Sequence, residues 1–319
     1  MFRLTARIEI KGTRTWVFDR VASVEITRDI DTLTDTCVLA LPKKVTWQGE
    51  ALNPLRRGDE VTAWLGYDDE LELAFRGHVT TIGLKAPVTI ACEDYMYQLK
   101  SRPARKLAYA NATLGRLLED QRLGIRHRVF GEQAIGPYRV TADTASGLLG
   151  DLKDHGGIRS FILLEEGEPV LYCGALFERA VTRKQVFATG VNIIDDTRLE
   201  VQDAADVKIK VRAISLMPDN TRVKVEAGDA DGQARTLHAF NKNERELRAW
   251  AEQELKRLKR DGLTGSFTTF GGSLVDKLDN VGIKIDGRRR GVYQVQKNVI
   301  RFSPEGFRQE ITIGGRVAE

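Results

Sequence analysis

The sequence has few cysteines and no long hydrophobic run. Its 319 residues include three widely separated cysteines, Cys37, Cys92 and Cys173, each among strand-forming neighbours. An odd number of distant cysteines does not suit a disulfide framework, so we expect buried, reduced thiols and a reducing compartment. No window reaches the roughly 18 apolar residues of a membrane-spanning helix, and the first residues lack the apolar run of a signal peptide. We therefore expect no membrane insertion.

The sequence also lacks a strong excess of one charge. It contains 49 Lys and Arg against 45 Asp and Glu, a formal net charge of +4. A dedicated nucleic-acid binder usually concentrates basic residues on one face, so this balance permits such a partner without indicating one. The strongest local cluster, Arg288–Arg290, lies between a turn and a strand without interleaved aromatics. We interpret it as the solvated tip of a hairpin.

Motifs of catalysis and cofactor binding are missing. No G-x-S-x-G, phosphate-binding loop or dinucleotide-binding glycine pattern occurs. The four histidines do not have the spacing of a metal site: His78, His127, His155 and His238. Neighbouring acids such as Glu93 and Asp94 are expected in solvated turns, because two catalytic carboxylates normally face each other across a cleft. The sequence thus predicts no enzyme, and no catalytic, cofactor-binding or metal-ligating residue.

Short alternating strands dominate both ends of the chain, and helices interrupt the middle. Residues 1–100 carry regular short strands separated by Gly, Pro and Asp, the pattern of an antiparallel barrel or sandwich. Residues 101–175 add helical leucine spacing and a hairpin, a small α+β unit. Residues 176–319 return to strands and enclose one long helix, 243–261. Its first residue, Asn243, precedes Glu246 as in a capping box. We predict a mainly β protein with these three domains.

One hairpin pattern occurs twice, about 220 residues apart. The stretches "RRGDEVTAWLGYDDELELAFRGHV" and "LDNVGIKIDGRRRGVYQVQKNV" each contain an aspartate in a turn, a following valine and an aromatic–glycine pair on the return strand. Internal duplication explains why both ends share features that the middle lacks. The repeated positions, which we expect to be structural, are Asp59, Val61, Phe75, Gly77, Asp279, Val281, Gly291 and Tyr293.

These blocks carry a resemblance to a known family. "DIDTLTDTCVLALP" with the first hairpin, and "AEQELKRLKRDGLTGSFTTFGG" with "VDKLDNVGIKIDGRRRGVYQVQKNVIRFSPEGFRQEITIGG", resemble baseplate hub or tail proteins of contractile-tailed bacteriophages. The likeness is greatest to the Mu-type hub and the late control proteins. It covers nearly the whole chain. In the second block, "LDN" stands where the first has "GD".

The resemblance implies a structural role without turnover. Such hubs are homotrimers in which each subunit carries two β-barrel domains similar to the tail tube protein. Six barrels then form a ring that joins a sixfold tail tube to a threefold central spike. The expected partners are the spike, the tube protein and the tape measure protein, with DNA passing through the lumen. The implied location is the virion tail baseplate, with host cytoplasm during assembly.

Two other functions remain open at this point. One is a single-stranded nucleic-acid-binding protein built from two OB-like barrels, which would show strongly salt-dependent affinity. The other is a tail-associated peptidoglycan hydrolase, which the missing catalytic motifs disfavour. The basic residues Lys208, Lys210 and Arg212 share one face of a predicted strand, which we expect to be exterior or to contact another subunit.

Overall fold

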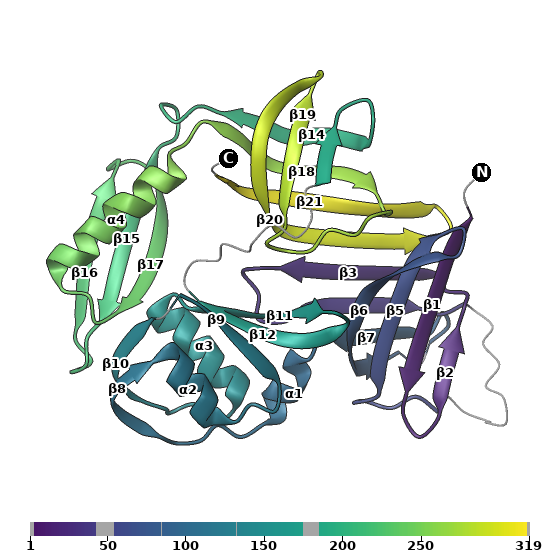
Figure 1. Ribbon diagram of the computed structural model, residues 1–319, viewed down its shortest axis with the longest axis horizontal. Helices are drawn as coiled ribbons and strands as arrows, with labels where there is room; N and C mark the ends of the chain where they lie inside the picture. Colours follow the sequence, from purple (N-terminus) through teal and green to yellow (C-terminus); the bar gives the residue numbers. More distant parts are fainter. Residues whose placement is uncertain (1–2, 43–53, 84, 132, 175–184, 318–319) are drawn as a thin grey trace.

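The computed structural model describes residues 3–42, 54–83, 85–131, 133–174 and 185–317. Its main feature is one large, mostly antiparallel sheet drawn from both ends of the chain (Figure 1). The strands of this sheet are β1 (Leu4–Lys11), β2 (Thr15–Phe18), β3 (Ser23–Asp29), β4 (Thr36–Ala40), β5 (Glu60–Tyr67), β6 (Glu70–Ile82), β7 (Thr89–Glu93), β13 (Gln185–Ala188), β14 (Ile193–Gln202), β18 (Gly262–Phe270), β19 (Asn280–Ile285), β20 (Arg288–Ser303) and β21 (Gly306–Val317).

The order of neighbours divides this sheet into two halves. The path runs β14-β18-β21-β20-β3-β4-β7-β6-β5-β1-β2, while β19 pairs with both β20 and β13. Strands β1 to β7 lie on one side of the β20–β3 contact, and β13, β14 and β18 to β21 lie on the other. The prediction of a mainly β protein is confirmed. Closure of either half into a barrel stays a prediction, because the path ends at edge strands among the described residues.

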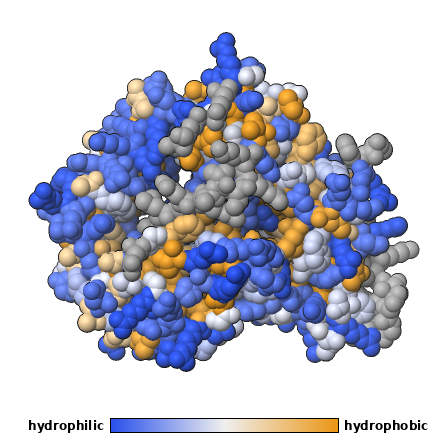
Figure 2. Space-filling model, viewed as in Figure 1, coloured by the Kyte–Doolittle hydropathy of each residue, from blue (hydrophilic) through white to orange (hydrophobic). Residues whose placement is uncertain are grey.

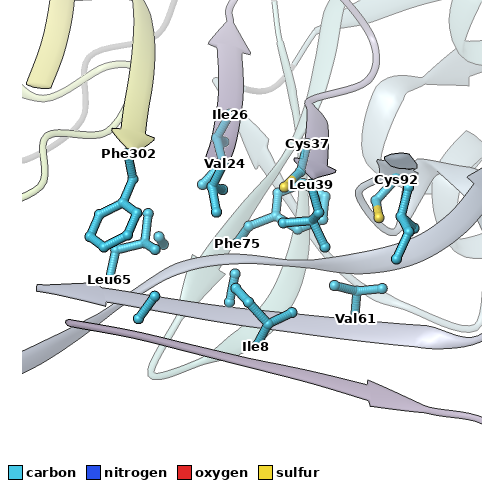
Figure 3. Close-up of a cluster of buried hydrophobic side chains, with 14 of the residues drawn as sticks. Ile8, Val24, Ile26, Cys37, Leu39, Val61, Leu65, Phe75, Cys92 and Phe302 are labelled. Atoms are coloured by element: carbon cyan, nitrogen blue, oxygen red, sulfur yellow. The ribbon is translucent and has the colours of Figure 1, made fainter. Parts of the chain in front are cut away.

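The first half of the sheet encloses a core made by period-2 alternation. Along β1, every second residue points inward, so Ile8 and Ile10 are fully buried. Val61 and Leu65 of the neighbouring strand β5 point into the same core (Figure 3). Phe302 of β20 also points into this core, beside Leu65. The C-terminal strands thus contribute directly to the hydrophobic core of the N-terminal half.

The second half has its own hydrophobic core. Phe267 of β18 packs tilted against Phe187 of β13, with ring centroids 5.0 Å apart. Ile283 of β19 and Ile311 of β21 are fully buried in the same cluster. The sheet therefore buries apolar surface in two separate clusters, the first of which also includes side chains from the C-terminal strands.

Residues 96–174 form a small α+β unit against one end of the large sheet (Figure 1). The elements are α1 (Met96–Ser101), β8 (Ala108–Thr113), α2 (Leu114–Gln121), β9 (Arg126–Phe130), β10 (Ala134–Arg139), α3 (Ala145–Gly156), β11 (Arg159–Glu165) and β12 (Glu168–Gly174). Thr113 and Thr144 cap the two longer helices through side-chain hydrogen bonds to backbone N–H groups. Both helices coincide with the leucine-spaced segments of the sequence, and their leucines are buried.

A third unit carries the longest helix. β15 (Ile209–Leu216), β16 (Arg222–Gly228) and β17 (Gln233–Phe240) form a three-stranded sheet, and α4 (Glu244–Leu258) covers one face (Figure 1). Asn243 caps α4 in a complete capping box with Glu246, as predicted. This unit has a separate core around Val211 and Leu247. Within the predicted second β-domain, these residues are therefore packed apart from the large sheet. The boundaries 1–100, 101–175 and 176–319 stay a prediction.

Among the described residues, none of the helices combines the length and hydrophobicity needed to cross a membrane. The three cysteines are buried free thiols, as predicted. Cys37 and Cys92 lie opposite each other on β4 and β7. Burial raises the pKa of Cys92 and of Cys173 to about 12. Both thiols are therefore protonated and unreactive at neutral pH.

Candidate functional site: a repeated hairpin and the joint between the repeats

The two halves of the large sheet repeat one strand order. Neighbours in the first half run β3-β4-β7-β6-β5-β1, and neighbours in the second run β14-β18-β21-β20-β19-β13. The corresponding strands also follow each other in the same order along the chain. The corresponding pairs are antiparallel in both halves, except that β1–β5 is antiparallel and β13–β19 is parallel. This correspondence supports the internal duplication that the two hairpins predicted.

Asp59 closes the turn before the first hairpin. Its backbone N–H donates to the Arg56 carbonyl at 3.2 Å, and its carboxylate accepts from the Arg56 N–H at 2.8 Å. Its carbonyl accepts from the Val79 N–H at 2.9 Å, which ties the turn to the return strand. Between them, Gly58 adopts a φ of +92°, a conformation that favours glycine.

Asp279 makes the same contacts before the second hairpin. Its N–H donates to the Asp276 carbonyl at 3.2 Å, and its carboxylate accepts from the Asp276 N–H at 2.8 Å. Its carbonyl accepts from the Val295 N–H at 2.8 Å. Leu278, in the place of the glycine, keeps a positive φ of +69° and is buried. The turn geometry is therefore retained although "GD" is replaced by "LD".

The valine after each turn occupies the same ladder position. Val61 lies opposite Gly77, and Val281 lies opposite Tyr293. A Cβ atom on Gly77 would stand 2.1 Å from the Glu93 carbonyl oxygen, so no larger residue fits there. In the second hairpin the equivalent position holds the fully buried ring of Tyr293. The aromatic residue and the glycine have thus exchanged places between the two copies.

The bulges of the two hairpins also coincide. Phe75 lies opposite Ala63, and Gly291 lies opposite Ile283. Immediately beyond these pairs the register shifts by one residue in both hairpins. Gly291 has a φ of +125°, whereas Phe75 needs no such conformation. The eight predicted positions therefore form two matched sets of four, one in each hairpin, rather than a single cluster.

The halves meet where β20 pairs antiparallel with β3. The register runs from Lys297 opposite Asp29 to Phe302 opposite Val24. Arg301 of β20 forms ion pairs of 2.9 Å with Glu25 of β3 and with Glu310 of β21. The first contact joins residues 276 apart in sequence. This ladder, here called the β3–β20 joint, makes the two halves one continuous sheet.

A buried ionic cluster lies beside this joint. Lys277 is fully buried, and its Nζ donates to both carboxylate oxygens of Asp35 at 2.7 Å. The same ammonium lies 5.0 Å from the ring centroid of Phe161 in the α+β unit. Arg28 of β3 donates to the Val275 carbonyl at 3.3 Å. The cluster therefore ties together the first half, the second half and the α+β unit through a few desolvated contacts.

Asp94 belongs to this cluster, and the prediction that it is a solvated turn acid is wrong. It is 4% exposed, and its carboxylate accepts hydrogen bonds of 2.9 Å from the backbone N–H groups of Asp35 and Met96. Burial and the charge of Asp35 raise the pKa of Asp94 to about 7. The pKa of Asp35 is likewise raised by burial, although Lys277 opposes this.

The raised pKa of Asp94 has a definite consequence for stability. The folded protein holds the Asp94 proton more tightly than the unfolded chain, whose aspartates titrate near their ordinary value of 3.8. The contribution of Asp94 to stability is therefore fully present at low pH. It is lost progressively as the pH rises through about 7, where the buried carboxylate ionises.

The histidines do not form a site. His78 is buried on β6, with its ring stacked on Tyr97 at 5.4 Å and its Nε2 2.9 Å from Gln98. Burial lowers the pKa of His78. His155 lies in the last turn of α3, and its Nδ1 lies 3.1 Å from the Asp151 carbonyl. Over the described parts of the chain, no group of three His, Cys, Asp or Glu side chains is arranged to hold a metal ion.

A surface cleft of about 290 Å³ lies over β5 and β6, next to the turn between β11 and β12. Three of its charged groups are paired with each other, since Arg76 bridges Glu60 at 3.0 Å and Glu168 at 2.9 Å. No cysteine, serine or histidine lines this cleft, so it offers no thiol, serine hydroxyl or imidazole.

Comparison with solved structures gives matches over nearly the full chain. A 43 kDa tail protein of prophage MuSo2 from Shewanella oneidensis is 14% identical, with a TM-score of 0.66 over 99% of this chain and 100% of that one. A tail protein from Neisseria meningitidis MC58 is 14% identical, with a TM-score of 0.64 over 97% and 96%. An E. coli type VI secretion component, described as similar to the T4 tail proteins gp27 and gp5, is 12% identical, with a TM-score of 0.59 over 98% and 77%.

These similarities establish the fold. The predicted resemblance to phage tail and baseplate proteins is confirmed at this level, because the same architecture extends over both halves, the α+β unit and the small sheet. No protein-family model and no curated protein matched the sequence. The buried Lys277–Asp35 pair was missed by the sequence analysis. The only sequence signal for it was Lys277 directly before Leu278-Asp279, the pair that stands where the first hairpin has Gly58-Asp59.

Proposed function

We propose that this protein is the structural hub of a contractile phage tail or a related injection machine. One observation carries the proposal: a chain with the fold of tail proteins contains the same six-strand unit twice, joined into one sheet by the β3–β20 joint. Three copies would supply six such units. A ring of this kind presents pseudo-sixfold symmetry to a tail tube and threefold symmetry to a central spike.

The physical reason for a ring lies in the sheet edges. An open sheet leaves backbone N–H and C=O groups unpaired at its ends, and such edges promote uncontrolled association. Head-to-tail contacts that close after three copies satisfy these groups without creating a filament. In this function the protein acts through shape and interfaces, without catalysis. The lumen of the ring would accept the tape measure protein and then DNA.

The proposed partners and location follow from the same role. The ring would contact the spike on one face and the tail tube protein on the other, as part of the virion baseplate, after assembly in the host cytoplasm. In the β5–β6 cleft, the ion pairs of Arg76 with Glu60 and Glu168 suit a role in which these charges stabilise structure. The basic residues of β15 already have acidic partners, since Lys210 and Arg212 both pair with Glu226.

The test is the absolute mass in solution, measured by light scattering on a sizing column over a concentration series. A stable species near three times 35.7 kDa supports the hub, and electron microscopy should then show a ring with a central hole. A species that remains at 35.7 kDa at high concentration, alone and with tail tube and spike proteins, contradicts it. Salt-dependent binding to a single-stranded oligonucleotide by that monomer would favour the OB-like alternative.

A further inference from the structure

Exposed hydrophobic side chains concentrate in one stretch of the sequence, from β13 through β14. Seven large hydrophobic residues are exposed among the described residues, and four of them fall between residues 186 and 201: Val186, Val191, Ile194 and Val201. Val191 and Val201 are 76% and 75% exposed. In Figure 2, hydrophobic residues are visible near the top of the face shown, in the region of β14, β18 and β19. Grouped exposed apolar residues mark interaction surfaces.

Two of these residues, Ile194 and Val201, lie on β14, which is an edge strand of the large sheet. It pairs with β18 on one side, and no described strand pairs with its other side. None of its ten residues is buried. A long, exposed edge strand with apolar side chains is a template for pairing with another strand.

The internal repeat indicates which strand would pair with this edge. The strand equivalent to β14 in the first half is β3, and the corresponding edge of β3 is occupied by β20 in the β3–β20 joint. The strand equivalent to β20 in the first half is β6. Each half therefore offers two edges, one on β3 or its equivalent β14, and one on β6 or its equivalent β20. Within the chain, the edges of β3 and β20 pair with each other. Among the described residues, the edge of β14 and the corresponding edge of β6 have no strand partner.

The unused edge of β6 can be located by comparison with β20. In β20, the register shifts between Val295 and Lys297, and the residues from Lys297 onward pair with both β21 and β3. In β6, the same shift occurs between Val79 and Thr81. Thr81 and Ile82 pair with β7, and among the described residues no strand pairs with their other side. This short edge corresponds to the part of β20 that receives β3.

We propose that the free edge of β14 pairs, antiparallel, with the C-terminal end of β6 in a second copy of this chain. The contact would repeat, between copies, the β3–β20 joint that already exists within the chain. Repeated head to tail, it would close the ring, so this inference rests on the proposed hub function. It assigns the strands and the register of the contact, which the ring by itself does not define.

The register follows from the equivalent residues of β3 and β14. Ile26 of β3 and Leu199 of β14 occupy equivalent positions, traced through the paired strands β4 and β7 in one half and β18 and β21 in the other. Three residues further on, Asp29 corresponds to Gln202. The exposed side chain of Val201 then corresponds to Arg28, which is buried in the existing joint.

The existing joint therefore predicts one contact pair in particular. Lys297 lies opposite Asp29, so Thr81 of one copy should lie opposite Gln202 of the next. The Ile30 N–H donates to the Gln296 carbonyl, which makes Asp29 and Lys297 a pair without hydrogen bonds between its own two backbones. Cα atoms in such pairs are about 4.5 Å apart, within the range that a disulfide spans.

The experiment is disulfide trapping with the full chain. The double variant Thr81→Cys/Gln202→Cys is oxidised mildly and analysed by non-reducing gel electrophoresis. We expect covalent dimers and closed trimers that disappear on reduction. Two controls match it. Asp29→Cys/Lys297→Cys should cross-link within one chain without an increase in mass, which shows that the chemistry works at this geometry. Thr81→Cys/Lys224→Cys, with the second cysteine on exposed β16, should give no covalent oligomer.

The outcomes distinguish a failure of the β14–β6 contact from a failure of the proposed hub function. Covalent trimers from Thr81→Cys/Gln202→Cys alone support the β14–β6 contact. A trimer by light scattering that does not cross-link, while the Asp29→Cys/Lys297→Cys control does, overturns the contact and leaves the hub. Equal cross-linking in the Lys224→Cys control also overturns the contact. A monomer at every concentration, alone and with tail tube and spike proteins, that also forms no cross-links overturns both.

Discussion

Replacing Lys277 by methionine should destabilise the protein strongly, because it leaves Asp35 buried without its cation. The Nζ lies 2.7 Å from each carboxylate oxygen. At that distance, with an effective dielectric constant of about 20, one charge pair attracts by about 6 kcal/mol before desolvation is subtracted. Removing one partner of such a buried pair costs about 3–5 kcal/mol. The lost contact with Phe161 adds to this loss, since a desolvated cation–π contact is worth about 2 kcal/mol.

The assay is urea unfolding at pH 8, followed by tryptophan fluorescence and circular dichroism. The control is Lys208→Met, which removes a lysine paired with Asp231 at 2.6 Å but with both side chains about two-thirds exposed. Surface pairs contribute about 0–1 kcal/mol, so this variant should unfold almost like the wild type. The double variant Lys277→Met/Asp35→Asn should recover much of the lost stability. A loss for Lys277→Met no larger than for Lys208→Met would refute the reasoning.

Three further changes test other parts of the structure. Gly77→Ala should lower the free energy of unfolding by about 1–3 kcal/mol, because the added Cβ meets the Glu93 carbonyl. The control Gly115→Ala in α2 has free space around its Cβ, so it should be neutral or stabilising by up to about 1 kcal/mol. Equal shifts of the melting temperature in the two variants would contradict this reasoning. The stability of Asp94→Asn relative to the wild type should increase as the pH rises from 5 to 8, because only the wild type must ionise a buried carboxyl with a pKa of about 7. A difference in urea midpoints that does not change with pH would count against this. Asn243→Ala should lose about 1 kcal/mol with the capping box of α4, again measured by urea midpoints, and no loss would show that this cap is not stabilising.

Local patterns were predicted from the sequence where a few neighbouring residues decide the structure. The capping box at Asn243 and the leucine spacing of α2 and α3 each depend on residues within one or two turns. The hairpin repeat was also visible, because both copies retain an aspartate that bonds to the residue three positions before it. The mainly β class follows from short alternating strands at both ends of the chain.

The prediction for Asp94 failed for a physical reason. A pair of adjacent acids after a strand normally lies in a solvated turn, and nothing within a few residues distinguishes Asp94 from that case. Its burial results from packing among the first half, the α+β unit and the loop that carries Lys277, 242 residues from Asp35. The separate core of β15–β17 and α4 was likewise not anticipated, since the same alternation would serve a strand of the large sheet.

Periodicity and contacts within short segments were enough to predict the alternating strands at both ends, the leucine-spaced helices, the cap at Asn243 and two related hairpins. Which strand edges meet depends on long-range packing. Backbone N–H and C=O groups are the same at every strand, so a strand edge carries little information about its partner. The choice of β20 for β3 depends on side chains such as Phe302 entering the core of the other half, and on ion pairs between residues 276 apart.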